Sequence, residues 1–184
     1  MLAFELSRVD SAFPRPLPLS PSSPVPLVTR QDLGSHLESL REYGWHFLQK
    51  SKRYEQLGYT ATWWELRHSG LFPSFKVAIN YINDVAALAR AEKHHPTILV
   101  FDRVHVEIGL DTHDTIERPA MDLNSSDSDT VVARWPGITL RDIRMALLIN
   151  PLLDQHKVIE RSPSTHYPIP RYEDLIDVRV DKFE

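Results

Sequence analysis

The chain of 184 residues contains no cysteine. This absence excludes disulfide bonds, thiolate nucleophiles and cysteine-ligated zinc, and it is compatible with a reducing compartment. Long apolar runs are also missing, since none approaches the roughly 20 residues that span a bilayer. There is no basic excess either, because 21 lysines and arginines stand against 25 acidic residues. A net charge of −4 gives no electrostatic footprint for nucleic acid or an anionic membrane, so we expect neither as a direct partner.

The first residues lack the order of a secretory signal, in which positive charge precedes an apolar run. Arg8, Arg15 and Arg30, with several serines between them, have the composition of a weak mitochondrial leader. Glu5 and Asp10 oppose that interpretation. We therefore expect a cytoplasmic protein, with mitochondria as the alternative.

Composition divides the chain into parts. Proline and serine dominate residues 11–27, so residues 1–26 are predicted to form an extended or disordered arm. Residues 115–136 contain a polar, acidic run and are predicted to form a long loop. Residues 154–184 form a charged C-terminal extension whose apolar end could add an edge strand or dock as a tail. The remaining residues, 27–153, are numerous enough for one domain with a real core.

Three segments of this domain carry helical signals. Thr29 begins a capping box with Asp in the place of Glu, and Gly44 is expected to end the helix that follows. Ser74 caps a second predicted helix, and Thr139 caps a third, which is expected to end at Pro151. Apolar residues of the second helix step by 3, 4, 3 and 4 and form one stripe: Phe75, Ala78, Ile82, Val85 and Ala89.

Strand-forming residues lie between these helices. Residues 60–68 are predicted to form one strand, residues around Gly70 are predicted to continue as a second strand, and residues 46–59 are expected to form a long loop. Residues 98–101 and 104–108 then form a predicted hairpin around a tight turn.

The element order is therefore α-β-β-α-β-β-α. It predicts an α+β fold in which a four-stranded antiparallel sheet has its helices packed on one face. Gly109 is expected to mark a bulge in the last strand.

Two adjacent histidines, His94 and His95, precede a proline that forces the second helix to end. A third histidine, His113, comes after the hairpin. A hairpin that turns at residues 102–103 pairs positions whose numbers sum to about 205, so His113 returns beside residues 92–93. The sequence thus predicts three imidazoles at one end of one hairpin, which suits proton transfer or metal binding.

Metal binding is the weaker of these two interpretations. Three imidazoles are typical of a His₃ zinc site, but adjacent histidines rarely bind one ion because their side chains start in different directions. We therefore expect no bound metal and favour proton transfer. His105 is expected on the sheet face opposite the core. The other histidines are expected at surface or structural positions: His36, His46, His68, His156 and His166.

Taken in order, these motifs resemble the pterin-4a-carbinolamine dehydratase family. The resemblance is carried by His94-His95-Pro96, the strand pair after it, Thr112-His113, and Gly137-Ile138-Thr139 before a helix. Further matches are Gly44-Trp45, Leu66-Arg67 and residues 72–75. The resemblance covers residues 27–153 and implies the same α-β-β-α-β-β-α order.

The resemblance implies a hydro-lyase that converts a 4a-hydroxytetrahydropterin to quinonoid dihydropterin and water in tetrahydrobiopterin recycling, with no cofactor. His94 and His113 would be the acids that protonate the leaving hydroxyl. His95 would bind the pterin and take part in removing the N5 proton. Other expected substrate contacts are Glu92, Thr112 and Asp114. A homodimer or homotetramer is implied as well.

One departure from the family pattern supports an alternative. The family usually carries Glu four residues before the first histidine of the pair, where this chain has Arg90; the nearest acid is Glu92. The chain could therefore keep the fold and lose turnover. It would then act as a dimerisation or assembly cofactor, or as a pterin-binding module.

Overall fold

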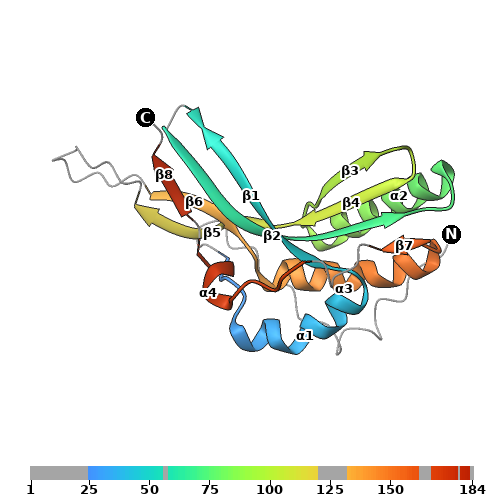
Figure 1. The fold of residues 1–184 in the computed structure, drawn as a ribbon, viewed down its shortest axis with the longest axis horizontal. Coiled ribbons are helices and arrows are strands. Elements are labelled where there is room, and N and C mark those ends of the chain that lie inside the picture. The colour runs from blue at the N-terminus through green and yellow to red at the C-terminus, as the bar shows by residue number, and fades with distance from the viewer. Residues whose placement is uncertain (1–24, 56–57, 120–131, 162–166, 178, 183–184) are drawn as a thin grey trace.

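The computed structural model describes residues 25–55, 58–119, 132–161, 167–177 and 179–182. It consists of an antiparallel sheet with helices on one face (Figure 1). The helices are α1 (Arg30–Glu42), α2 (Phe75–Glu92), α3 (Leu140–Gln155) and the short α4 (Tyr172–Leu175). The strands are β1 (His46–Tyr54), β2 (Tyr59–Leu71), β3 (Thr97–Phe101), β4 (His105–Leu110), β5 (Thr112–Pro119), β6 (Val132–Gly137), β7 (Glu160–Arg161) and β8 (Arg179–Lys182).

The long strand β2 organises the main sheet. The sheet runs in the order β1-β2-β4-β3, and β7 and β8 also pair with β2. Residues 59–67 of β2 pair with β1, and residues 66–71 pair with β4, so the two neighbours occupy largely different halves of the strand. Strands β5 and β6 form a separate two-stranded sheet. The predicted α+β fold with an antiparallel sheet is therefore confirmed.

The helices begin where the sequence predicts. The Thr29 side chain accepts a hydrogen bond from the backbone of Asp32, whose own side chain accepts from the Thr29 backbone, which completes a capping box. Ser74 caps α2 in the same way without the reciprocal bond. Thr139 and Asp142 form a second capping box at the start of α3.

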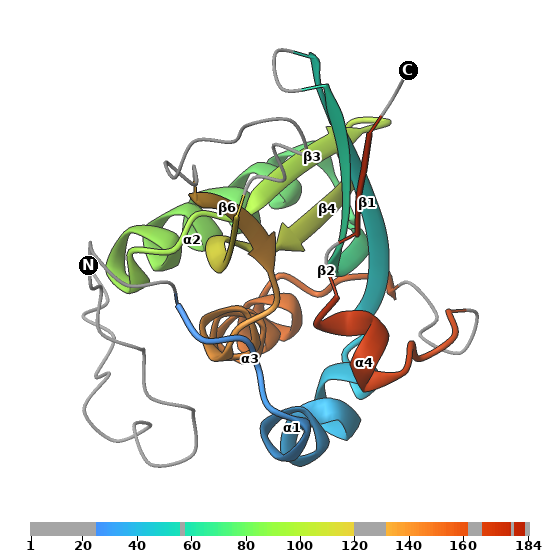
Figure 2. The same cartoon turned by 90° about the vertical axis from the view of Figure 1, so that its left-hand side faces the viewer.

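Helix α3 lies between α1 and α2 and contacts both (Figure 2). Its side chains and those of Leu66, Val106 and Ile108 form one core with α2. The predicted stripe of α2 is only partly buried: Ala78, Val85 and Ala89 are buried, whereas 55% of Phe75 is exposed.

Two predicted strand boundaries were wrong. Residues 60–72 do not contain two strands, because β2 runs unbroken from Tyr59 to Leu71. Its partner in the first hairpin is β1, which lies in the segment expected to be a loop. The outer half of β1 is exposed on most of its residues, so it lacks the apolar alternation that predicts a strand.

The segment 115–136 also differs from expectation. It begins in β5 and ends in β6, which pair as a hairpin, so the predicted long loop can include only residues 120–131; these lie outside the described residues. The end of α3 was wrong as well. Pro151 lies inside the helix, which continues to Gln155 because Leu152 and Leu153 are buried beyond it.

The expected bulge at Gly109 is absent from the β3–β4 pairing, since residues 97–101 pair with residues 105–109 without a shift. Gly109 serves a different purpose. A Cβ atom there would lie 2.7 Å from Oε2 of Glu65, so any other residue would require this fully buried carboxylate to move. The irregularity that does occur lies in β5, between Thr112 and Ile116.

Both ends of the described chain are attached to the domain. Val25, in the arm predicted for residues 1–26, is buried and its backbone N–H donates to the carbonyl of Asp114 at 3.1 Å. In the C-terminal extension, β8 adds the expected edge strand and Leu175 is buried in the core.

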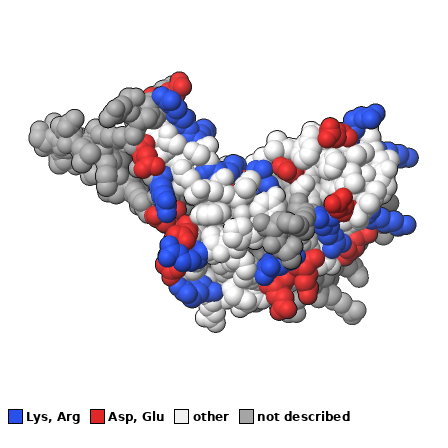
Figure 3. All heavy atoms as spheres, viewed as in Figure 1, with Lys and Arg blue, Asp and Glu red and all other residues white. Residues whose placement is uncertain are grey.

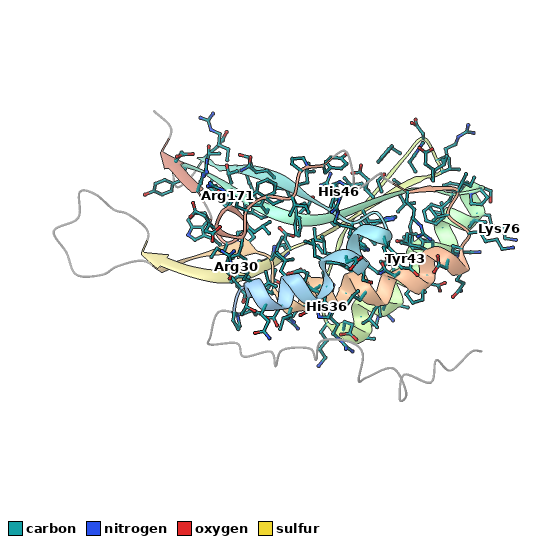
Figure 4. All side chains as sticks on the ribbon, turned by 60° about the horizontal axis from the view of Figure 1, so that its bottom comes forward. Arg30, His36, Tyr43, His46, Lys76 and Arg171 are labelled. Carbon is teal, nitrogen blue, oxygen red and sulfur yellow. The ribbon has the colours of Figure 1, made fainter. Side chains whose placement is uncertain are left out.

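The contact between α1 and α4 links the two ends of the chain. Arg30 forms an ion pair with Glu173, and the Tyr172 hydroxyl donates to the carbonyl of Val28 at 3.1 Å. Figure 4 shows Arg30 and Arg171 at the same end of the molecule, far from Lys76 on α2. None of the helices in the described part of the chain combines the length and apolar character that a membrane span needs.

Candidate active site

The turn after α2 places the histidine pair. Helix α2 ends at Lys93, which adopts the left-handed conformation with φ of 51°. The backbone N–H of His94 donates to the carbonyl of Ala89 at 3.1 Å, and β3 begins three residues later. This geometry turns His94 inward, where it is buried, and leaves His95 exposed.

Asp142 is the centre of the buried polar network around His94. Its Oδ1 lies 2.7 Å from Nε2 of His94. Its Oδ2 accepts hydrogen bonds from the Thr112 hydroxyl at 3.0 Å and from the Thr139 backbone N–H at 2.7 Å. The Asp142 side chain is fully buried, so these interactions fix its position in a region that excludes water.

The carboxylate of Asp142 determines how the His94 ring is used. A carboxylate accepts, so Nε2 of His94 carries the proton of this hydrogen bond. The ring then has Nδ1 left for another partner. An imidazole held by a carboxylate in this way has a fixed orientation and tautomer, and the carboxylate stabilises positive charge on the ring.

The hairpin brings Thr112 to the same carboxylate. Residue numbers of the β3–β4 pairs sum to 206, as in the pair of Thr97 with Gly109, which is close to the predicted register. The chain then continues directly into β5, where Thr112 is buried against Asp142 and His113 is exposed. His94 and Thr112 are thus brought together, while the side chains of His95 and His113 both face solvent beside them.

The remaining candidates lie close by in the chain. Glu92 is largely buried and receives two hydrogen bonds from Arg144, from Nε at 2.8 Å and from Nη2 at 3.0 Å. Asp114 is half-buried. The sequence analysis identified Thr139 as the cap of the third helix and missed the bond between its capping-box partner, Asp142, and His94. It also missed the pairing of Glu92 with Arg144, because the two residues are 52 positions apart and no local pattern links them.

The other histidines have structural surroundings. Burial, with help from the nearby charge of Arg161, lowers the pKa of His68 to about 3. Burial also lowers the pKa of His46, whose ring stacks on Tyr167 with centroids 3.8 Å apart. His156 lies 2.7 Å from Asp84 through Nε2. His166 lies outside the described residues.

His105 lies on the helix-free face of the sheet, as predicted, and stacks on Phe101 with centroids 5.4 Å apart. This face is hollowed between the β1–β2 and β3–β4 hairpins, and its visible charges are of both signs (Figure 3). Within the described ranges, no group of three or more His, Asp or Glu side chains is placed to hold a metal ion.

Comparison with known proteins agrees with these features. The family model for pterin 4 alpha carbinolamine dehydratase matches residues 27–152. The chain belongs to this family. Membership supports a pterin dehydratase role, and lyase activity in general, for this domain. The match includes His94, Thr112 and Asp142 and ends before β7, α4 and β8.

One similar solved structure is a transcriptional coactivator/pterin dehydratase from Brucella melitensis. It is 21% identical in sequence, the alignment covers 68% of this chain and 97% of that chain, and the TM-score is 0.39. No match was found among the curated proteins.

Proposed function

We propose that this protein dehydrates a 4a-hydroxytetrahydropterin to quinonoid dihydropterin by histidine acid–base catalysis, as in tetrahydrobiopterin recycling. The observation that carries the proposal is the buried hydrogen bond between His94 and Asp142, beside the strand that presents His113. This arrangement lies inside the region that matches the dehydratase family.

The reaction needs one acid and one base across a flat heterocycle. The C4a hydroxyl takes up a proton and leaves as water, while N5 loses a proton and its electron pair forms the new C–N double bond. The oxidation level does not change overall, so histidine side chains can supply all of the proton transfer. A positioned acid or base contributes roughly 10²–10⁴-fold to such a rate.

His94 is the proposed acid for one stereoisomer. Its Nε2 is occupied by Asp142, so Nδ1 is the nitrogen that donates to the leaving hydroxyl. Asp142 stabilises the charged ring before the transfer and keeps Nδ1 aimed in one direction. Thr112 acts through the same carboxylate, since its hydroxyl donates to Asp142.

His113 and His95 are the proposed partners on the exposed side of this network. His113 is the acid for the other stereoisomer, and the half-buried Asp114 next to it could orient its ring. His95 binds the pterin and helps to remove the N5 proton. Both side chains are exposed, which leaves them accessible to a substrate that arrives from solvent.

We also propose that the protein is a homodimer or homotetramer. Strand β3 lies at an edge of the main sheet and exposes Leu99, Val100 and Phe101 by 42–45% each. An exposed apolar edge strand can pair with another chain through its free backbone groups. Light scattering after gel filtration measures the oligomeric state directly, and a monomer at micromolar concentration would contradict the proposal.

The catalytic proposal is tested with 4a-hydroxytetrahydropterin generated enzymatically, measured beside the uncatalysed reaction. His94→Ala and His113→Ala are each expected to lower kcat by roughly 10²-fold or more, because each removes a proton donor. The double variant should approach the uncatalysed rate. His95→Ala should raise KM as well as lower kcat. His36→Ala, on α1, is the matched control and should behave as the wild type.

The non-enzymatic alternative is supported by the residues just before the histidine pair, where the carboxylate usual in the family is replaced or already bound. Arg90 stands where the family usually has Glu, and Glu92 is already bound to Arg144. If pterin binds, as measured by calorimetry, while the wild-type rate equals the uncatalysed rate, a binding or assembly role is preferred. Wild-type kcat in the His94→Ala/His113→Ala double variant would exclude acid catalysis by this pair.

A further inference from the structure

Two polar links between side chains join the end of α2 to the start of α3. Glu92 accepts two hydrogen bonds from Arg144, and His94 binds Asp142 at 2.7 Å. The partners are two residues apart on each side, and in both segments the acid precedes the base along the chain, so the two segments pair in antiparallel order. The acid of the first link is on α2, and the acid of the second link is on α3.

The Glu92–Arg144 link is buried and geometrically constrained. The exposed fraction of the side chain is 12% for Glu92 and 8% for Arg144. Nε and Nη2 of Arg144 approach different carboxylate oxygens at 2.8 and 3.0 Å, which is the fork geometry that only an arginine provides. Both oxygens of Glu92 are therefore engaged, and its carboxylate is poorly placed to bind a pterin as well.

Lys93 lies between Glu92 and His94, and its backbone conformation must be stabilised by the surrounding structure. A non-glycine residue in the left-handed conformation is disfavoured, so the surrounding structure must maintain it. The carboxylate on one side of Lys93 is fixed by Arg144. Any change in the Lys93 backbone would rotate the next residue, His94, away from Asp142.

We propose that Glu92 and Arg144 are positioning residues that hold the end of α2 so that His94 stays on Asp142. Glu92 then acts through Arg144 and the backbone, not through contact with substrate, which replaces the role expected from the sequence. The kinetic consequence rests on the proposed function, whereas the effect on the His94–Asp142 bond does not.

The hydrogen bond between His94 and Asp142 can be observed by NMR without any substrate. A ring N–H that donates to a buried carboxylate exchanges slowly and resonates downfield, so ¹⁵N-histidine labelling and NMR report the His94 Nε2 proton; His94→Ala assigns it. We expect Arg144→Met to abolish or broaden this resonance. Arg144→Lys, which keeps the charge and loses the fork, should give an intermediate result.

Asp84→Asn is the matched control. Asp84 and His156 also join α2 to α3, at 2.7 Å, but far along both helices from His94. This variant should lower the midpoint of urea unfolding and leave the His94 resonance unchanged. The proposal is overturned if Arg144→Met keeps the wild-type resonance, or if Asp84→Asn loses it as well. If Arg144→Met does not unfold cooperatively, the His94 resonance is measured in the isosteric variant Glu92→Gln, for which the same loss is expected.

Kinetics separate this proposal from the proposed function. Misplacement of a reacting group by a remote change can cost roughly 10²-fold in rate, so we expect kcat of Arg144→Met to fall by about 10- to 100-fold with little change in KM. Loss of the resonance with an unchanged kcat supports the positioning role and contradicts catalysis by His94. An inactive wild-type protein refutes the dehydratase function, and the NMR result then decides the positioning role alone.

Discussion

Replacement of His68 by phenylalanine should remove a pH dependence of folding. His68 lies in the core, is 1% exposed, and contacts the Trp45 ring with centroids 5.3 Å apart. Neither of its ring nitrogens has a hydrogen bond of normal geometry. Burial, assisted by the charges of Arg161 and His46, lowers its pKa to about 3, so the ring is neutral in the folded protein.

The sign and size of the effect follow from this lowered pKa. In the unfolded chain, His68 takes up a proton as the pH falls below about 6.5, whereas the folded protein does not until about pH 3. Proton uptake by the unfolded chain alone lowers the free energy of unfolding. Between pH 7.5 and pH 4.5 the loss due to His68 amounts to roughly 2.5 kcal/mol.

Urea unfolding of wild type and His68→Phe at a series of pH values measures this term. At pH 7.5 the two should differ by a constant offset of about 1–3 kcal/mol, because the phenyl ring is larger than imidazole and adds volume beside Trp45. Below pH 6.5 the wild type should lose stability faster, at up to about 1.4 kcal/mol per pH unit. The carboxylates are common to both proteins, so their contributions cancel in the difference, which then reports His68 together with its electrostatic coupling to His46. Parallel curves over this range would refute the reasoning.

Three further changes test the boundaries of the fold by urea unfolding. Leu175→Ala, in α4, should cost about 2–5 kcal/mol because this side chain is 3% exposed in the main core; a change below about 0.5 kcal/mol would show that the C-terminal extension contributes little. Deletion of residues 1–24 should leave the unfolding midpoint and kcat unchanged, because the prolines and serines in this segment favour an extended arm outside the domain core, and loss of cooperative unfolding would contradict that. Pro151→Ala should stabilise α3 by about 1–3 kcal/mol, since it restores a helical donor; destabilisation would show that the proline fits the helix without cost.

Local signals in the sequence were sufficient for the helix starts, the second hairpin and the fold class. Thr29, Ser74 and Thr139 could be identified as helix caps because capping depends on side chains within a few residues. The position of one tight turn, where both Asp102 and Arg103 have positive φ, gave the β3–β4 register to within one residue: the observed pairs sum to 206 and not 205, because the loop spans residues 102–104. These features involve neighbours in the chain, so one sequence contains them.

Other features depend on residues that are far apart in the sequence, and only the tertiary structure determined them. Strand β1 is stabilised by pairing with β2 and not by an apolar pattern of its own, and α3 passes through Pro151 because residues beyond it are buried in the core. The acid near the histidine pair is a similar case. Its sequence position suggested a substrate contact, but Arg144, 52 residues away, occupies the Glu92 carboxylate.

The candidate site also has features that the sequence predicts and features that only tertiary packing decides. The sequence by itself predicts that His94, His95 and His113 lie at one end of a hairpin, because turn position and strand length determine where the chain returns. Only the folded chain decided which of them is buried. Asp142 is assigned to helix capping by its local spacing, yet it receives His94 from 48 residues away because α3 packs against the end of α2. Packing between helices thus selects one histidine of the three for a carboxylate partner and leaves the other two in solvent.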